Sequence, residues 1–456
     1  MGEFFGTDGI RGVAGQFPLD RPTVERIGYS LATKLGARLG RPPLVVIGRD
    51  TRESGPWIEA ALSRGLKAAG AGARSAGVIT TPGVAYLTRV SGADAGLVIS
   101  ASHNAFQDNG IKIFAPSGRK LDDATEQAIE RDLKADPIGL PDFAAAPLEA
   151  EEELQERYLA FLRDEIGAGL DLSRLRVVLD CANGASSEIA PLLFAGLGAL
   201  TTAINVEPNG RNINLDSGSL HPEELQRIVV ESEADLGVAF DGDADRVLLV
   251  DARGRLVDGD EVLFIMADYL AARDRLAGRR VVATVMSNLG LELALAERGI
   301  TLARMPVGDK YVLEGLLSGG GSLGGEQSGH IIFPEISLAG DGMITALEVL
   351  RAMTESGRGL EELGSGFARC PQVLINVAVA RKPPLESVPA IREAMAAANA
   401  EMAGRGRLLV RYSGTENLAR VMIEGRDEGM IHRQAEDLAR IIAEHLGRAP
   451  GLKPGH

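Results

Sequence analysis

Short apolar runs alternate along this chain with longer segments of helical periodicity. The run Leu-Val-Val-Ile at 44–47 is typical of a buried strand, and a helical pattern follows it from about residue 55 to residue 69. Similar strand patterns occur at 96–99, 177–179 and 281–283. Because strands and helices that alternate in sequence bury their apolar faces best as parallel sheets covered by helices, the chain is predicted to form α/β units with largely parallel sheets.

The chain also carries a loose internal repeat. Three of the predicted strands end in a polar loop that enters a helix, with loops beginning near residues 48, 180 and 287. This repeat predicts three related α/β domains, and the pattern after residue 371 predicts a smaller α+β domain. The expected domains are 1–150, 151–255, 256–369 and 370–448, with a linker rich in Pro and Ala at 136–147.

The net charge of the chain limits the kinds of molecule that the protein is expected to bind. The 456 residues carry a net charge of −15 and contain no long run of Lys or Arg, which disfavours a nucleic-acid binder. An anionic substrate would therefore need a local cluster of cations. The two cysteines lie far apart in sequence and are expected to be reduced thiols rather than a disulfide. No basic and apolar leader and no run of 18 uncharged apolar residues occurs, so we expect a cytoplasmic protein without a membrane partner.

A candidate nucleophile follows the strand predicted at 96–99. The sequence Ser-Ala-Ser-His-Asn at 100–104 places Ser102 where a strand gives way to a loop, next to His103 and ten residues before Lys112. A serine in such a loop can attack a substrate or carry a phosphoryl group. A serine that only caps a polar loop is the alternative, and this motif alone does not exclude it.

A candidate metal site lies between the apolar runs at 236–240 and 247–250. Asp241, Asp243 and Asp245 alternate there, and three carboxylates brought together are unfavourable unless a cation lies among them. Hard oxygen ligands suit Mg²⁺. An EF-hand loop beginning at Asp241 would need Gly at its sixth position and Glu at its twelfth, but the chain has Arg246 and Ala252. The pattern therefore predicts a Mg²⁺ site of another kind, against the alternative of a solvated acidic loop.

A third polar cluster precedes the apolar residues 331–333. Glu326, Ser328 and His330 alternate, so their side chains could point the same way. A carboxylate with a hydroxyl suits hydrogen bonding to a sugar, and a histidine suits acid/base catalysis. A polar hairpin tip is the equally open alternative.

A fourth cluster lies near the C-terminus. Basic, hydroxyl-bearing and glycine residues share one loop and the strand after it: Arg411, Ser413, Gly414, Thr415 and Arg420. Arginine, hydroxyls and the backbone N–H groups of a loop that contains Gly together form an anion-binding site. It is not a Walker A loop, since no Gly-Lys-Ser/Thr is present; an ordinary turn is the alternative.

These four motifs in this order resemble the α-D-phosphohexomutase family. The likeness runs from Phe-Gly-Thr-Asp-Gly-Ile-Arg-Gly at 5–12 to Arg-Val-Met-Ile-Glu-Gly at 420–425, and includes Val-Gly-Asp-Lys-Tyr at 307–311. The opening motif and Gly-Glu-Gln-Ser-Gly-His at 325–330 most resemble the members that act on glucosamine phosphates. Members that act on mannose or glucose phosphates are the alternative within the family.

The resemblance implies three α/β domains and a smaller fourth around a central active-site cleft. It implies an isomerase that is a phosphoprotein: Ser102 would carry a phosphoryl group, first supplied by a sugar bisphosphate or by autophosphorylation, and would bind one Mg²⁺ with the three aspartates. Glu326 and Ser328 would contact the sugar, and the loop around Arg411, Ser413 and Thr415 would hold the distal phosphate. Candidates for charge stabilisation and acid/base work are Arg11, His103, Lys112, Arg246 and His330.

The chain departs from the family's motifs at two positions, and rival functions stay open. The family often has Pro where this chain has Ala105 and Asn417, which affects loop rigidity but removes no ligand. A sugar-phosphate-binding protein without activity and a metal phosphatase that uses Ser102 are the rival functions. The oligomeric state stays open, with a homodimer as one alternative.

Overall fold

The structure is a computed structural model that describes residues 4–6, 8–135, 148–402, 404–413 and 417–447. These residues form two compact units: unit 1 comprises those within 1–286 and 298–365, and unit 2 comprises those within 287–297 and 366–456. The predicted linker at 136–147 lies outside the described residues.

The first sheet of unit 1 has six strands in the order β1-β2-β6-β5-β3-β4. The strands β5, β3 and β4 are parallel, whereas β1, β2 and β6 pair in antiparallel fashion. The bounds are β1 (Phe5–Gly6), β2 (Gly9–Val13), β3 (Leu44–Arg49), β4 (Gly72–Val78), β5 (Ala95–Ile99) and β6 (Asp108–Phe114).

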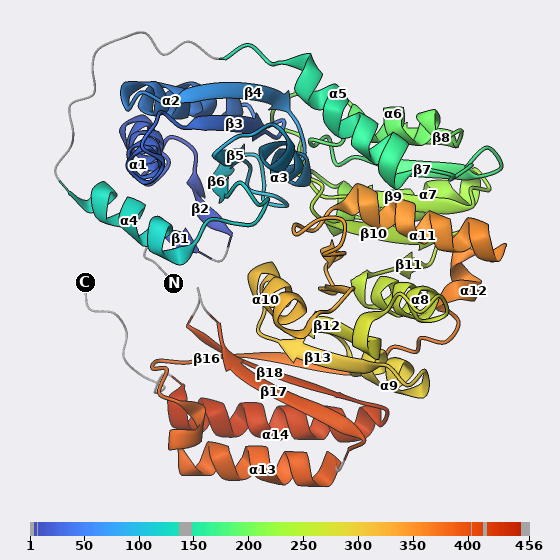
Figure 1. Cartoon of the computed structure of the whole chain (residues 1–456). Helices are drawn as coiled ribbons and strands as arrows, with labels where there is room; N and C mark the ends of the chain where they lie inside the picture. Colours follow the sequence, from blue (N-terminus) through green and yellow to red (C-terminus); the bar gives the residue numbers. More distant parts are fainter. Residues whose placement is uncertain (1–3, 7, 136–147, 403, 414–416, 448–456) are drawn as a thin grey trace. The chain divides into compact units, whose positions relative to one another are not determined.

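Four helices accompany this sheet: α1 (Arg21–Leu39), α2 (Gly55–Ala68), α3 (Thr81–Val90) and α4 (Asp123–Lys134). Helices α1 and α2 lie side by side (Figure 1) and share an apolar core with β3 and β5 that includes Ile27, Leu62 and Leu97. Glycine permits their close approach, because a Cβ atom at Gly65 would lie 1.9 Å from the Glu25 carbonyl oxygen of α1.

The second sheet of unit 1 has the order β11-β10-β9-β7-β8. Its strands are β7 (Arg176–Asp180), β8 (Leu200–Ile204), β9 (Leu236–Phe240), β10 (Val247–Asp251) and β11 (Leu256–Val257), with helices α5 (Glu152–Ala160), α6 (Ile189–Gly196) and α7 (Glu223–Glu231). Phe240 pairs with Val247 in the antiparallel β9–β10 hairpin, so the three aspartates lie on the tight connection between two fully buried strands.

The third sheet has the order β13-β12-β14-β15. Its strands are β12 (Arg280–Thr284), β13 (Thr301–Met305), β14 (Gly324–Gly325) and β15 (Ile331–Ile332); the helices of this region are α8 (Gly259–Ala271), α10 (Asp309–Gly319), α11 (Gly342–Ser356) and α12 (Leu360–Gly364). The short β14–β15 hairpin presents residues 326–330 at its tip.

Unit 2 contains the antiparallel sheet β16-β18-β17. Its elements are β16 (Gln372–Ala378), β17 (Gly406–Tyr412), β18 (Leu418–Gly425), α9 (Leu289–Glu297), α13 (Pro389–Met402) and α14 (Glu428–Leu446). Helices α13 and α14 pack on one face of the sheet (Figure 1) through a core that includes Ile391, Val421 and Leu438. The Glu424 carboxylate accepts hydrogen bonds from Asn288 and Leu289 and so joins the start of α9 to this unit.

The predicted α/β class with a smaller α+β part is confirmed, but the α/β sheets are mixed rather than largely parallel. The hairpins β9–β10 and β14–β15 account for part of the difference, because a tight connection between neighbouring strands forces antiparallel pairing. The bounds of the four predicted domains stay predictions.

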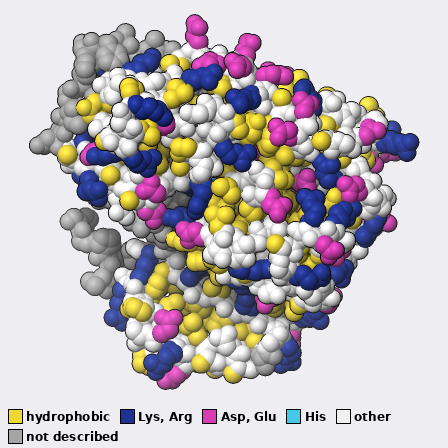
Figure 2. All heavy atoms as spheres, viewed as in Figure 1, with side chains coloured by type: hydrophobic (Ala, Val, Ile, Leu, Met, Phe, Trp, Pro, Cys, Tyr) yellow, Lys and Arg dark blue, Asp and Glu magenta, His cyan; other side chains and the backbone are white. Residues whose placement is uncertain are grey.

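No helix among the described residues is long and apolar enough to cross a bilayer. Lys and Arg side chains are interspersed with Asp and Glu over the face in Figure 2.

Candidate functional site

Ser102 lies in the loop after β5 in a left-handed backbone conformation, with φ of 53°. Its side chain is buried, and Oγ donates a 2.6 Å hydrogen bond to Asp241 Oδ2. His103 Nδ1 lies 3.2 Å from the same Oγ. The structure therefore brings together two motifs that lie 139 residues apart in sequence.

Asp241, Asp243 and Asp245 converge on the β9–β10 turn, and one oxygen from each lies within 4.8 Å of the others. All three residues are buried. Asp243 Oδ1 and Asp245 Oδ1 are buried carboxylate oxygens without a hydrogen-bond partner among the described residues. Buried anionic oxygens that no donor satisfies are costly unless a cation binds them, so these residues fit a hard divalent metal ion.

Lys112 partly compensates this cluster from β6. Its Nζ lies 2.8 Å from Asp243 Oδ2, 3.3 Å from Asp245 Oδ2 and 3.2 Å from Asp8 Oδ2. Burial lowers the pKa of Lys112, but the carboxylates of Asp243, Asp8 and Asp245 outweigh burial and hold its pKa well above the usual value. The ammonium group is therefore a fixed positive charge at the site.

The three aspartates differ in their electrostatic surroundings. Burial, with the negative charges of Asp245 and Asp243, raises the pKa of Asp241 well above its usual value. Burial also disfavours the charge on Asp245, but Lys112 and His330 outweigh burial and lower the pKa of Asp245 well below its usual value. A cation at this site would remove the repulsion that raises the pKa of Asp241.

The two predicted site histidines are shifted in opposite directions. Burial, with the nearby cations Arg246 and Arg11, lowers the pKa of His103 to about 4. Burial lowers the pKa of His330 as well, but the hydrogen bond and charge of Asp245 outweigh burial and raise it. His330 Nδ1 lies 3.7 Å from Asp245, and Nε2 lies 3.9 Å from Asp309.

A cavity of about 480 Å³ in unit 1 has six of the predicted residues in its lining: Arg11, His103, Asp245, Arg246, Glu326 and His330. Glu326 Oε1 accepts a 3.0 Å hydrogen bond from the Gly308 N–H, and Ser328 Oγ lies 3.5 Å from Glu326 Oε2. The cavity therefore combines cationic and carboxylate side chains, which suits a ligand that has both a phosphate and hydroxyl or amino groups.

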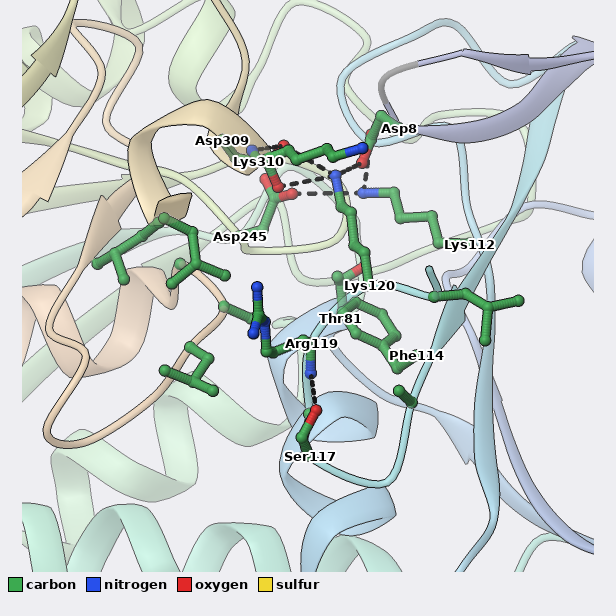
Figure 3. A pocket seen from close by; sticks show the side chains of 18 of the residues that line it. Asp8, Thr81, Lys112, Phe114, Ser117, Arg119, Lys120, Asp245, Asp309 and Lys310 are labelled. Atoms are coloured by element: carbon green, nitrogen blue, oxygen red, sulfur yellow. Dashed lines mark hydrogen bonds and ion pairs between the residues drawn. The ribbon is translucent and has the colours of Figure 1, made fainter. Parts of the chain in front are cut away.

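A second cavity of about 490 Å³ in unit 1 is shown in Figure 3. Its lining shares four titratable residues with that of the first cavity: Asp8, Asp245, Asp309 and His330. Lys120 Nζ lies 2.7 Å from Asp8 Oδ1 and 2.7 Å from Asp309 Oδ2. Burial lowers the pKa of Lys120, but Asp309 and Asp8 outweigh burial and raise it. Lys120 therefore links Asp8, of the opening motif, to Asp309 at the start of α10.

The predicted anion-binding residues belong to unit 2. Arg411 of β17 is directly opposite Arg420 of β18 in the sheet. Burial, with the positive charge of Arg420, lowers the pKa of Arg411. Two arginines at opposite positions on neighbouring strands are able to donate charge-assisted hydrogen bonds to one phosphate. The Ser413 carbonyl accepts a 2.8 Å hydrogen bond from Lys382, whereas Gly414 and Thr415 lie outside the described residues.

Sequence reasoning missed three residues that support the Ser102 loop: Asp50, Arg52 and Asn214. Arg52 and Asn214 each donate a hydrogen bond to the Ser102 carbonyl oxygen, both at 2.9 Å. The polar loop that begins near residue 48 contains Asp50 and Arg52, and its place in the internal repeat is the signal that could have found them. The segment that contains Asn214 carried no such signal.

Comparisons with known proteins give the same family for nearly the whole length of the chain. Its residues match the families described as phosphoglucomutase/phosphomannomutase alpha/beta/alpha domain I over 2–137, domain II over 156–254, domain III over 258–369, and the C-terminal domain over 374–441. The chain is 48% identical to phosphoglucosamine mutase of Koribacter versatilis, with 98% of this chain and 97% of that protein covered. It is 49% identical to phosphoglucosamine mutase of Solibacter usitatus, with 98% and 99% covered.

Solved structures have the same fold. The crystal structure of a phosphoglucomutase/phosphomannomutase family protein from Burkholderia thailandensis matches with a TM-score of 0.78 at 24% identity, over 97% of each chain. Aspergillus fumigatus N-acetylphosphoglucosamine mutase, in complex with GlcNAc-6P and magnesium, matches with a TM-score of 0.67 at 18% identity, over 96% of this chain and 95% of that one.

Proposed function

The chain belongs to the phosphoglucomutase/phosphomannomutase family, and we propose that it interconverts glucosamine 6-phosphate and glucosamine 1-phosphate through a phosphoryl group carried on Ser102. The observation that carries this proposal is the 2.6 Å hydrogen bond from Ser102 Oγ to Asp241 within the buried aspartate cluster. The identity of 48–49% to phosphoglucosamine mutases over nearly the whole chain supports the choice of sugar. The product would supply synthesis of UDP-N-acetylglucosamine and cell-wall precursors.

Phosphoryl transfer would begin from phosphorylated Ser102. The bond between phosphorus and Ser102 Oγ breaks while a bond to the 1-hydroxyl oxygen of glucosamine 6-phosphate forms, which gives a bisphosphate. The proton of that hydroxyl is lost and Ser102 regains one. The bisphosphate then turns end for end and returns its 6-phosphoryl group to Ser102, so the net reaction is an isomerisation.

The surrounding residues stabilise charge and move protons in this proposal. Asp241, Asp243 and Asp245, with Ser102, would hold Mg²⁺, which neutralises charge on the transferring phosphoryl group when it is bound. Lys112 and Arg11 stabilise negative charge near Ser102. His103, Lys112 and His330 remain the candidates for proton transfer. The pKa of His103, about 4, keeps its imidazole neutral at pH 7 but makes it a weak base, whereas Lys112, whose pKa is held well above its usual value, stays protonated and can act only as an acid.

The substrate contacts in this proposal are those that the sequence motifs predict. Glu326 and Ser328 would bind the sugar, and Arg411, Ser413, Gly414, Thr415 and Arg420 would bind the phosphate that does not react. Two arginines opposite each other support this role, because a phosphate accepts bidentate, charge-assisted hydrogen bonds. A cytoplasmic location and a homodimer remain predictions.

The experiment is incubation of the protein with glucosamine 6-phosphate, Mg²⁺ and a trace of bisphosphate, with products followed by phosphorus NMR. Glucosamine 1-phosphate should form, and Ser102→Ala should lower kcat at least about 10³-fold. The exposed Ser232→Ala is the matched control and should behave as the wild type. Release of free phosphate would favour a phosphatase, and absence of any turnover would favour a binding protein. Faster conversion of mannose or glucose phosphates would favour the alternative within the family.

A further inference from the structure

One buried arginine, Arg52, donates several hydrogen bonds to the backbone of the loop that contains Ser102. Arg52 follows β3 and is 1% exposed. Its Nη2 donates hydrogen bonds to the carbonyl oxygens of Ser102 at 2.9 Å and Asn104 at 2.8 Å. Its Nη1 donates to the carbonyl oxygen of Asp108 at 3.1 Å and to that of Ala105. Four carbonyl groups of one loop therefore converge on one guanidinium, whose donors form a rigid planar fork.

Asp50 connects the same arginine to the other side of Ser102. Its carboxylate accepts hydrogen bonds from Arg52 Nε at 2.8 Å, from the Arg52 N–H at 3.0 Å and from Ser100 Oγ at 2.6 Å. Ser100 Oγ in turn accepts a 2.9 Å hydrogen bond from the Ser102 N–H. The Asp50–Arg52 pair therefore fixes Ser102 through its carbonyl group directly and through its N–H group by way of Ser100.

The backbone of Ser102 needs such support. Its φ of 53° lies in the left-handed region, which is unfavourable for a residue with a Cβ atom. Asn214 adds a second anchor, since its Nδ2 lies 2.9 Å from the Ser102 carbonyl oxygen and 3.1 Å from that of Asn104. The bond from Arg52 to the Ala105 carbonyl also restrains the position where the family often has Pro.

We propose that Arg52, supported by Asp50, is a positioning residue for phosphoryl transfer that fixes the Ser102 backbone so that Oγ stays on the aspartate cluster. This inference rests on the proposed function of Ser102. The hydrogen bonds of Arg52 reach the carbonyl groups of the loop rather than Oγ, so Arg52 acts through the backbone. Ser102 must donate and regain a phosphoryl group in the same geometry, and a displacement of about 1 Å at a reacting atom can lower the rate about 10²-fold.

The test uses Arg52→Lys, because removal of the whole side chain would leave the buried Asp50 uncompensated and endanger folding. Lysine keeps the charge but cannot reach four carbonyl groups in a planar fork. Arg49→Lys is the matched control: Arg49 ends the same strand, but its guanidinium pairs with Glu59 at 3.1 Å. Asn214→Ala removes the second anchor without touching the charge.

Three quantities are measured on full-length protein whose folding is checked by circular dichroism. These are the Ser102 phosphate content by mass spectrometry, the single-turnover rate of phosphoryl transfer to glucosamine 6-phosphate, and amide hydrogen exchange in the peptide that spans 100–110. Arg52→Lys should transfer about 10²-fold more slowly per phosphorylated Ser102, with a half-saturating concentration of glucosamine 6-phosphate in the single-turnover rate within about twofold of wild type, and with faster amide exchange. Asn214→Ala should show the same changes, about tenfold in rate. Arg49→Lys should match the wild type.

A wild-type transfer rate in folded Arg52→Lys would overturn the inference, as would a loss of rate without faster amide exchange in this peptide. An equal loss of rate in Arg49→Lys would also overturn the inference, because any substitution of an arginine near the end of β3 would then slow the transfer. If the wild type itself carried no phosphate on Ser102 and transferred none, the proposed function would fail first, and the two failures are thereby distinguished.

Discussion

The ammonium group of Lys112 lies 2.8 Å from the carboxylate of Asp243, and both side chains are buried. Lys112 pairs with two of the three aspartates on the β9–β10 turn, Asp243 and Asp245, and a divalent cation would balance the negative charge that one ammonium group leaves. Asp243 therefore belongs both to the proposed metal site and to the ion pair with Lys112 of β6, so its substitution tests the metal site directly.

Asp243→Asn should weaken Mg²⁺ binding about 10- to 100-fold and lower activity at limiting Mg²⁺, because it removes one charge from a site that depends on charge and oxygen ligands. The Mg²⁺ dependence of activity and calorimetric titration with Mg²⁺ measure the two effects. Asp274→Asn, at an exposed position, is the control. Identical Mg²⁺ titrations for Asp243→Asn and wild type would refute the metal site.

Arg411→Ala should chiefly impair binding of the phosphosugar, because it removes a charge-assisted contact to phosphate of about 1.5–3 kcal/mol, or roughly 10- to 100-fold in KM. Steady-state kinetics with glucosamine 6-phosphate measure the effect. Arg433→Ala removes an exposed arginine of the same unit and should leave KM unchanged. An unaltered kcat/KM in Arg411→Ala would place the phosphate site elsewhere.

Sequence patterns predicted much of this fold because the buried strands are short, strongly apolar and bounded by polar loops. The strand predicted at 44–47 forms the first four residues of β3, and the helix predicted from about 55 to 69 is α2. The mixed pairing could not be predicted from the sequence. Residues 236–240 of β9 and 247–250 of β10 form apolar runs in fully buried strands, and such runs look the same in parallel and antiparallel sheets.

The sequence predicted those parts of the candidate site whose residues share one motif. It did not predict the contacts that tertiary folding makes between distant segments. The aspartate spacing alone indicated the metal cluster. The hydrogen bonds from Arg52 and Asn214 to Ser102 span 50 and 112 residues, and nothing in the sequence pairs positions so far apart. The alternation of Glu326, Ser328 and His330 suggested one shared direction, whereas the cavity lining includes Glu326 and His330 without Ser328.

Asp341→Asn should change how stability depends on pH. Asp341 caps α11 and accepts a 2.7 Å hydrogen bond from the Tyr158 hydroxyl. Burial raises its pKa from 3.8 to about 6. The folded protein thus binds this proton more tightly than the unfolded chain, so the wild type loses stability as pH rises from about 4 to about 6 and has lost it fully above that range.

Asparagine cannot ionise and still accepts the helix-capping hydrogen bonds, so the variant should lack this loss. Between pH 4 and 7 the stability difference should move in favour of the variant by about 3 kcal/mol, measured as the difference in thermal unfolding at each pH. Tyr158→Phe removes the donor to the carboxylate and should instead destabilise the protein more at pH 7 than at pH 4. A pH-independent difference between Asp341→Asn and wild type would contradict the assignment.

The protein should prefer glucosamine phosphates over glucose and mannose phosphates. Glu326 lies in the cavity lining, where Asp8 and Asp309 pair with Lys120 and Asp245 pairs with Lys112, so Glu326 is the lining carboxylate that we expect to face a cationic 2-amino group. A hydrogen bond to a charged donor contributes about 1.5–3 kcal/mol, or roughly 10- to 100-fold in kcat/KM. Gln327 belongs to the same motif, but its side chain donates to Asp258 Oδ2 at 3.2 Å, so the sugar preference is expected to depend on Glu326.

The measurement is kcat/KM for the three sugar phosphates at one Mg²⁺ and one bisphosphate concentration, in wild type, Glu326→Gln and Gln327→Ala. Glu326→Gln keeps the size of the side chain and removes its charge, so it should lower the preference for glucosamine over glucose phosphate about tenfold. Gln327→Ala should leave that ratio unchanged even if it lowers both rates. Wild-type values that are equal or higher for glucose or mannose phosphate would overturn the assignment of the sugar, and an unchanged ratio in Glu326→Gln would show that another group reads the 2-position.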